Sequence, residues 1–156
     1  MKIRVIAAGK IKGKYIKEVT ADYLERVKKY TQVEIVEIKD EPIFDEKERE
    51  ILIEKEGLKL LKLIKDEDYT ICLDEKGKSF SSLMFASLIG EKQISGIKTV
   101  NFLIGGALGL SENVKKKCSL ILSLSHFTFP HQLVRVILLE QLYRAFTILK
   151  GEPYHK

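Results

Sequence analysis

The chain has 156 residues, 45% of them hydrophobic, which suits a single domain, residues 1–156, with a buried core. No apolar run reaches the roughly 18 residues of a membrane-spanning helix, and the N-terminus is too short in its apolar part for a signal peptide, so we expect a cytoplasmic protein without a membrane segment. The net charge of +5 lies entirely in residues 113–156, with seven Lys or Arg and two Glu. This basic end indicates an anionic partner.

The predicted elements alternate between strand and helix. Apolar, β-branched runs predict strands, in chain order, at Ile3–Ala8, Val33–Ile38, Tyr69–Leu73, Thr99–Ile104 and Leu120–Leu124. Helical patterns separate these runs at about 14–29, 45–65, 79–91, 111–117 and 131–149. Helix starts are indicated at Ser79 or Ser81, Ser111 and Pro130, and helix stops at Gly90 and Gly151. The alternation predicts an α/β fold with a largely parallel sheet flanked by helices.

The last predicted helix is apolar on almost every side. Only Glu140, Arg144 and Thr147 form a narrow polar strip along it. We expect its own sheet to cover one side and a second copy of the chain to cover another, which predicts a homodimer. Arg135 falls within the apolar arc, where a lone guanidinium needs an anionic partner.

Two segments near strand ends are candidates for a binding site. Gly105-Gly106-Ala107-Leu108-Gly109 follows a predicted strand and precedes a helix, so its backbone N–H groups can approach a ligand, although a tight turn without a ligand is the alternative. The hydroxyls, two Phe rings and Pro of residues 123–132 can form a small pocket, although a helix-capping turn with core Phe residues is the alternative.

Other familiar chemistries lack their patterns. The segment 9–14, Gly-Lys-Ile-Lys-Gly-Lys, has neither the spacing nor the Ser/Thr of a Walker phosphate loop. No histidine pair has zinc-ligand spacing with a carboxylate or thiol, so we expect no metal. Cys72 and Cys118 have no partner motif and are expected to be free thiols, as in a reducing compartment.

Several sequence blocks together form a specific pattern. They include Leu73-Asp74-Glu75-Lys76-Gly77-Lys78, Phe102-Leu103-Ile104-Gly105-Gly106, Thr128-Phe129-Pro130-His131-Gln132, Glu140-Gln141-Leu142-Tyr143-Arg144-Ala145 and the terminal Pro153-Tyr154-His155-Lys156. With these blocks the chain resembles the RlmH family of SPOUT-class methyltransferases. The resemblance covers the whole chain and is most specific in its C-terminal part.

The resemblance implies a SPOUT-type α/β fold with a C-terminal trefoil knot that holds S-adenosylmethionine. It implies a homodimer that methylates N3 of a pseudouridine in the helix-69 loop of 23S rRNA, within the assembled ribosome. The residues implied to bind the cofactor are Leu73, Gly105, Gly106, Leu124, Ser125, His126, Phe127, Thr128 and Phe129.

The resemblance also directs attention to the end of the chain. Tyr154, His155 and Lys156 are expected to contact RNA, with His155 of a partner subunit as the base, although a solvated tail is the alternative. Arg135 and Arg144 are expected to bind phosphate or to stabilise negative charge on the target base. Two other classes of function remain open: a non-catalytic ribosome-binding or RNA-binding factor, and a nucleotide-dependent enzyme using the Gly-rich turn.

Overall fold

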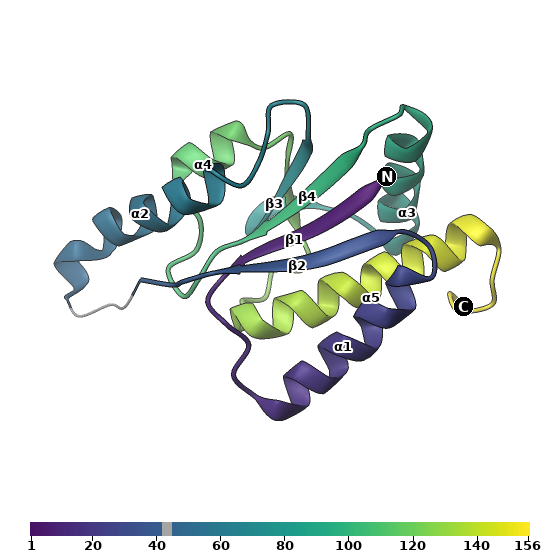
Figure 1. Ribbon diagram of the computed structural model, residues 1–156, viewed down its shortest axis with the longest axis horizontal. Coiled ribbons are helices and arrows are strands. Elements are labelled where there is room, and N and C mark those ends of the chain that lie inside the picture. The colour runs from purple at the N-terminus through teal and green to yellow at the C-terminus, as the bar shows by residue number, and fades with distance from the viewer. Residues whose placement is uncertain (42–44) are drawn as a thin grey trace.

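The computed structural model describes residues 1–41 and 45–156 (Figure 1). The predicted alternation of strands and helices is confirmed, and the predicted helix 45–65 is a short 3-10 turn, η1, followed by α2. The elements are β1 (Lys2–Ala8), α1 (Lys14–Lys28), β2 (Gln32–Ile38), η1 (Glu46–Glu48), α2 (Arg49–Leu61), β3 (Tyr69–Ser79), α3 (Ser82–Ile94), β4 (Thr99–Ile104), α4 (Glu112–Lys117), β5 (Leu120–Ser123) and α5 (His131–Lys150).

The strands form one sheet in the order β2-β1-β4-β3-β5, and every pairing is parallel. This confirms the predicted parallel sheet, because parallel neighbours need crossover connections such as the intervening helices. Strand β3 is longer than predicted and carries an irregularity, since Leu73 and Lys78 both pair with Leu122. The residues between them bulge outward, and Gly77 lies so close to β5 that an added Cβ would be 2.8 Å from backbone atoms of Ile121.

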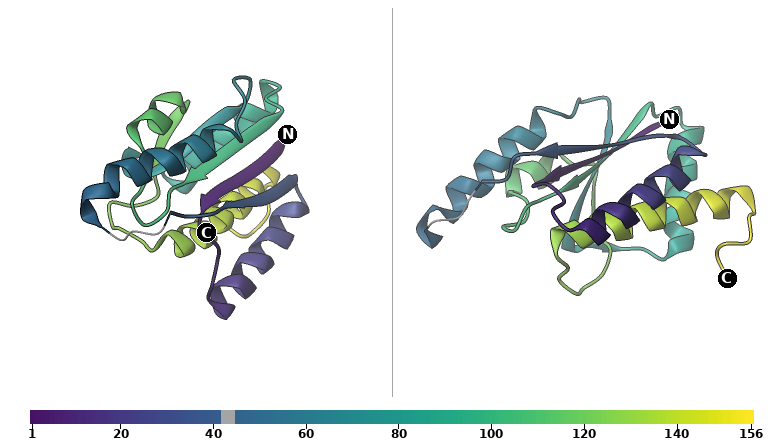
Figure 2. Two further views of the ribbon diagram at one scale, coloured as in Figure 1. Left: turned by 60° about the vertical axis from the view of Figure 1, so that its left-hand side comes forward. Right: turned by 60° about the horizontal axis from the view of Figure 1, so that its bottom comes forward.

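Helices cover both faces of the sheet (Figure 2). On one face α1, α3 and α5 pack over the larger apolar core, to which β1 contributes Ile3, Val5 and Ala7. On the other face α2 and α4 cover a smaller cluster around Cys72 and Leu103. The result is a three-layer α/β arrangement in which the carboxyl ends of the strands point to one edge.

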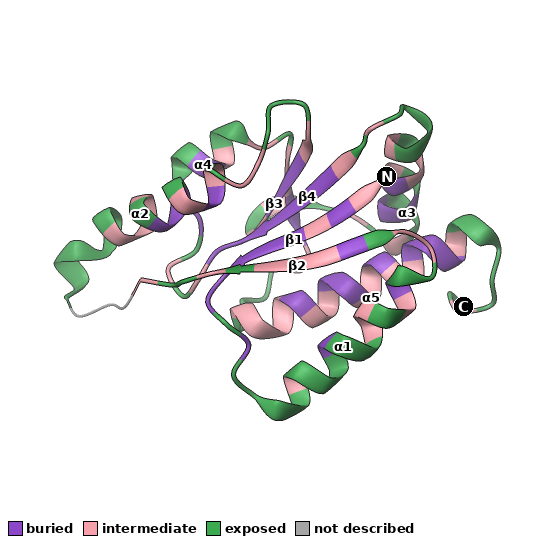
Figure 3. Cartoon of the chain, viewed as in Figure 1, coloured by how far each residue is buried: buried purple, intermediate pink, exposed green. Residues whose placement is uncertain are grey.

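Helix α5 is covered mostly by other helices of its own chain. Its many apolar sides therefore do not by themselves require a second copy, which corrects that step of the sequence analysis. The helix lies between α1 and α3 as well as against the sheet (Figure 3). Leu138 and Leu142 are therefore fully buried without a second copy. Leu133, Val136 and Ile137 are only half-buried and are not packed against the core. The homodimer therefore stays a prediction, with these three side chains as the apolar surface available to it.

The helix-boundary predictions are mostly confirmed. The hydroxyls of Ser81 and Ser111 cap α3 and α4 by accepting hydrogen bonds from backbone N–H groups, and Gly151 follows α5 with φ of 68°. The predicted stop at Gly90 is wrong, because this residue lies inside α3. An added Cβ there would lie 2.9 Å from Cδ2 of Leu149, so the glycine permits close packing of α3 on α5.

Two structural features are absent from residues 1–41 and 45–156. No helix in these ranges is long and apolar enough to cross a membrane. No group of three or more His, Cys, Asp or Glu side chains in the same ranges is arranged to hold a metal ion.

Candidate functional site

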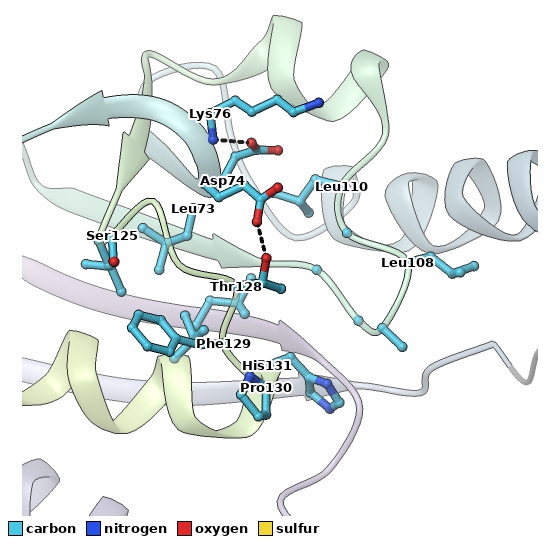
Figure 4. A pocket seen from close by; sticks show the side chains of 18 of the residues that line it. Leu73, Asp74, Lys76, Leu108, Leu110, Ser125, Thr128, Phe129, Pro130 and His131 are labelled. Atoms are coloured by element: carbon cyan, nitrogen blue, oxygen red, sulfur yellow. Dashed lines mark hydrogen bonds between the residues drawn. The ribbon is translucent and has the colours of Figure 1, made fainter.

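A cleft of about 810 Å³ opens at the carboxyl ends of β3, β4 and β5 (Figure 4). Three segments form most of its walls: residues 73–76 at the bulge of β3, residues 104–110 at the end of β4 and after it, and residues 124–131 except His126, between β5 and the start of α5. Ligands of open α/β sheets bind at this edge, where the strands end and loops diverge. The volume lies within the usual range for small-molecule and cofactor pockets.

The Gly-rich loop after β4 folds back on itself, and its glycines permit this. An added Cβ at Gly105 would lie 2.3 Å from the carbonyl oxygen of Gly109, which no side chain can tolerate. Gly109 has φ of 82° and its N–H donates to the carbonyl of Gly106 at 3.1 Å. The glycines are therefore required by the loop's own geometry, and the turn brings its backbone to the cleft wall.

A buried carboxyl group supports the same loop from behind. Glu56 of α2 is only 4% exposed, and an added Cβ on Gly106 would lie 3.0 Å from its Oε2 atom. Its Oε1 atom accepts a hydrogen bond from the N–H of Glu41 at 2.9 Å. Burial raises the pKa of Glu56, although backbone hydrogen bonds act in the opposite direction.

Charged and hydroxyl groups form a polar rim on one side of the cleft. The Thr128 hydroxyl donates to Glu75 Oε2 at 2.6 Å and so ties the β5–α5 loop to the bulge of β3. Lys115 pairs with Asp74 at 2.8 Å, and the N–H of Lys76 donates to the same carboxylate. Burial opposes ionisation of Asp74, but these hydrogen bonds outweigh it and hold its pKa below its usual value.

The structure brings most of the predicted cofactor residues together. Eight of the nine line this cleft, from all three wall segments. His126 does not, because its ring is exposed and its Nε2 atom lies 3.5 Å from the Ser79 hydroxyl. Sequence reasoning missed Asp74, Glu75 and His131 as lining residues. The signal for the first two was their position directly after Leu73 at the end of a predicted strand.

His131 begins α5 at the edge of the cleft. Burial and then the charge of Arg135 lower its pKa, and Asp40 opposes this shift. The ring therefore favours the neutral form, which can donate and accept one hydrogen bond each.

Arg135 lies below the cleft and is fully buried. The predicted need for an anionic partner is confirmed, and the partner is in the same chain: Nη1 donates to Glu37 Oε1 at 2.7 Å. Nη2 donates to the backbone carbonyls of Ala8 and Gly9 at 2.9 and 2.6 Å. In this conformation the guanidinium has no surface through which it could contact RNA.

The other predicted catalytic residues lie at the opposite end of α5. Arg144 pairs with Glu140 through Nε at 3.0 Å, and its Nη1 atom lies 3.4 Å from Nδ1 of His155. The Tyr154 ring packs against Tyr143, with centroids 4.6 Å apart. The tail is thus anchored on α5 at Tyr154, while His155 and Lys156 are exposed. His155 lies beside Arg144, which is 13 residues beyond His131 along α5, or roughly 20 Å, so His155 does not reach the cleft of its own chain.

The cleft suits the cofactor that the sequence resemblance implies. Leu73, Phe129 and Val134 offer apolar walls, the loops offer backbone donors and acceptors, and Asp74 and Glu75 offer carboxylates for a cationic ligand. S-adenosylmethionine combines an aromatic base, a polar ribose and positively charged groups, and it matches these three kinds of surface.

Comparisons with known proteins identify the family of the chain. A family model described as "Predicted SPOUT methyltransferase" matches residues 1–155. Ribosomal RNA large subunit methyltransferase H of Clostridium botulinum (strain Kyoto / Type A2) is 50% identical over 159 residues and covers 100% of both chains. The protein of the same name from Halothermothrix orenii is 49% identical with the same coverage.

Solved structures share the fold at low identity. A probable methylase family protein from Haemophilus influenzae matches 99% of this chain and 70% of its own, with a TM-score of 0.56 and 14% identity. A putative methyltransferase from Legionella pneumophila, solved in complex with bound S-adenosylmethionine, matches 93% of this chain and 66% of its own, with a TM-score of 0.51 and 14% identity. At such identities the likeness concerns the fold alone.

Proposed function

Because the chain belongs to the SPOUT methyltransferase family, we propose that it methylates large-subunit ribosomal RNA with S-adenosylmethionine as the methyl donor. The target we propose is N3 of a pseudouridine in the helix-69 loop of 23S rRNA, within the assembled ribosome. Such a substrate places the protein in the cytoplasm. The trefoil knot belongs to the same proposal, since it rests on the family resemblance.

The cleft residues would hold the cofactor by complementary surfaces. Leu73 and Phe129 would contact apolar parts, and the backbone of residues 105–106 and 124–129 would bind the adenine and ribose. Glu75 would attract the cofactor's positive charge with the oxygen that does not bind Thr128. When bound, S-adenosylmethionine supplies a methyl group on a sulfonium. The role of the cleft is therefore mainly to position that group in line with the acceptor nitrogen.

The acceptor nitrogen requires a base. N3 of a uracil-type ring carries a proton, which must leave before the nitrogen can attack. A neutral imidazole accepts protons near pH 7, and His155 is the candidate, taking the N3 proton on a ring nitrogen. Arg144 lies beside it and, with Lys156, would stabilise negative charge on the base. Arg135 has no part in this step because it is buried.

The separation of cleft and tail supports a composite site made by two copies of the chain. His155 lies beside Arg144, roughly 20 Å from its own cleft along α5, so a second copy must supply it. Leu133, Val136 and Ile137 lie on α5 near the cleft and are half-buried, which suits a two-fold interface there. An Ile137→Glu variant should sediment as a monomer and lose methyl transfer while still binding the cofactor.

The observation that carries the proposal is the gathering of eight predicted cofactor residues in one cleft of a chain from this family. The test uses ribosomes from cells that lack this gene, incubated with the protein and isotope-labelled S-adenosylmethionine. We expect label in the helix-69 fragment of 23S rRNA, located by mass spectrometry. Tight ribosome binding without any label would instead support a non-catalytic binding factor.

A mixing experiment tests the composite site. A chain without residues 154–156 is combined with a Ser125→Trp chain, whose added ring would fill the cleft. Each homodimer should be inactive, but each mixed dimer should hold one intact site. Random exchange should therefore restore about a quarter of the native activity. If mixing restores nothing while sedimentation shows that mixed dimers form, the tail does not act across an interface.

A further inference from the structure

A basic segment follows β1. Residues 9–17 contain Lys10, Lys12, Lys14 and Lys17 and no acidic residue, and all four side chains are exposed. Among them stands Tyr15, which is 80% exposed. Neither the cofactor site nor the proposed base uses these residues, so their arrangement calls for a separate explanation.

Side chains of β2 and α5 hold the turn that begins this segment. Glu37 Oε1 binds Arg135 and also accepts a hydrogen bond from the N–H of Ile11 at 3.0 Å. Gln132 Oε1 accepts from the N–H of Lys12 at 3.0 Å. These two hydrogen bonds, and those that Arg135 donates to the carbonyls of Ala8 and Gly9, fix the turn to β2 and to the start of α5. The backbone that carries the lysines is therefore held in a defined position.

This turn lies beside the cleft. It follows β1, whose carboxyl end is at the same edge of the sheet as the ends of β3 and β4. An added Cβ on Gly9 would lie 3.4 Å from Nε2 of His131, which itself lines the cleft. A ligand larger than the cofactor that enters the cleft would therefore pass close to the basic segment.

The placement of the lysines is unfavourable for the folded chain on its own. Lys14 and Lys17 lie in the first turn of α1, where the helix dipole favours negative charge, and no acidic residue is present in that turn. Among the described residues, no carboxylate lies within 4.0 Å of the ammonium groups of Lys10, Lys12 or Lys17, and Lys14 reaches only Glu18, at 3.9 Å. Local conflicts of this kind are expected at functional surfaces.

We propose that the basic segment is an RNA-docking surface. The lysines bind backbone phosphates next to the target nucleotide, and Tyr15 stacks on an unpaired base of the same loop. Exposed aromatic rings between basic residues are the pattern that binds single-stranded nucleic acid. The inference rests on the proposed function, because it assumes that the substrate in the cleft is RNA.

The lysines are tested by charge removal with a matched control. A Lys10→Gln/Lys12→Gln double variant is compared with Lys62→Gln/Lys98→Gln, whose exposed lysines precede β3 and β4 at the opposite edge of the sheet. Ribosome affinity is measured over a range of salt concentrations. The first variant should bind roughly tenfold more weakly at moderate salt, and its slope of log affinity against log salt should fall by about 1.5. The control variant and the S-adenosylmethionine affinity of both should match the native protein.

Stacking is tested separately at Tyr15. Tyr15→Ala should raise the KM for ribosomes by at least about fivefold, and Tyr15→Trp should restore it. Native salt slopes in the Lys10/Lys12 variant together with a native KM in Tyr15→Ala would overturn the inference. A native protein that transfers no methyl group to ribosomes would instead overturn the proposed function, and the salt slope would still decide whether the segment binds RNA.

Discussion

The two ends of α5 differ in how their polar groups are used. Near its start, Arg135 is buried and donates its hydrogen bonds to Glu37 and to backbone carbonyls. The neighbouring loops line the cleft there. At its end, Arg144 is half-exposed and shares Glu140 with the tyrosine of an exposed tail. The start of α5 thus borders a cleft within one chain, whereas its end anchors a tail whose last two side chains, His155 and Lys156, are exposed.

This difference separates the two steps of the proposed reaction. Cofactor binding needs only residues that one chain brings together. In the proposed reaction, methyl transfer also needs Arg144 and His155, which lie roughly 20 Å along α5 from the cleft and would come from another copy. Variants at the two ends should therefore fail in different assays.

The largest effect is expected for the two arginines. Arg135→Ala leaves Glu37 and two buried carbonyls without their donor and should lower the free energy of unfolding by about 3–5 kcal/mol. Arg144→Ala removes an i,i+4 pair with Glu140 and contacts with the tail on a partly exposed face, and should cost about 0.5–1 kcal/mol. Urea denaturation measures both, and equal losses would contradict the contrast between the two ends.

Removing the tail should affect transfer alone. A chain without residues 154–156, or with His155→Ala, should transfer methyl groups about 100-fold more slowly, about 2.7 kcal/mol in the barrier. Calorimetry should show native S-adenosylmethionine affinity in both. Transfer to ribosomes at the native rate would exclude His155 as the base and direct attention to Arg144.

Altering the Gly-rich loop should have the reverse effect. In Gly105→Ala the new methyl group collides with the backbone of Gly109, so the loop must shift and cofactor affinity should fall roughly 30-fold, about 2 kcal/mol. Gly13→Ala is the matched control, because its Cβ would lie 3.7 Å from the nearest atom, in Ile16. A folded Gly105→Ala protein with native affinity would show that this loop does not line the cofactor site.

A smaller effect is expected for the bond between the two loops. Thr128→Val removes the hydroxyl that Glu75 accepts and should weaken cofactor binding about fivefold, near 1 kcal/mol. Thr147→Val removes a comparable hydroxyl, bonded to the Arg144 carbonyl at the far end of α5. This control should change stability but not cofactor affinity. An equal loss of affinity in both variants would indicate a general loosening of the fold.

The smallest expected effect is the titration of His131. Burial lowers its folded pKa, so the folded state binds fewer protons than the unfolded state. The resulting stability is present above the unfolded pKa of about 6.5 and is lost as the pH falls through the folded value. Relative to His131→Gln, the native protein should lose less than about 0.5 kcal/mol between pH 7 and pH 5, because the half-buried ring is partly screened. Identical pH profiles in urea denaturation would contradict this.

The strands could be predicted because burial leaves a clear local pattern. Thr99–Ile104 was predicted with its observed bounds as an uninterrupted apolar run. The continuation of β3 beyond Leu73 was missed, because residues 74–77 carry the charges and glycine of an ordinary turn. Their pairing with β5 depends on a register shift, which only the neighbouring strand determines.

The parts of the candidate site that lie at strand ends could be predicted from the sequence. The role of a residue whose contact partner is distant in the sequence could not. The three wall segments follow predicted strands, so parallel topology alone brings them together. Arg135 was assigned to phosphate binding because periodicity shows that it lies among apolar residues but not that Glu37 is its partner. The sequence around Gly90 predicts a helix stop, because the contact of Gly90 with Leu149 involves another helix and leaves no local pattern.

The order of the sheet also has a consequence for synthesis. Strand β1 is made first but pairs with β4, and the contact between Arg4 and Asn101 spans 97 residues. The larger core closes only when α5, which follows all five strands in the chain, adds its leucines. Chains with such distant contacts fold slowly, and until α5 packs, their apolar strands are exposed to aggregation.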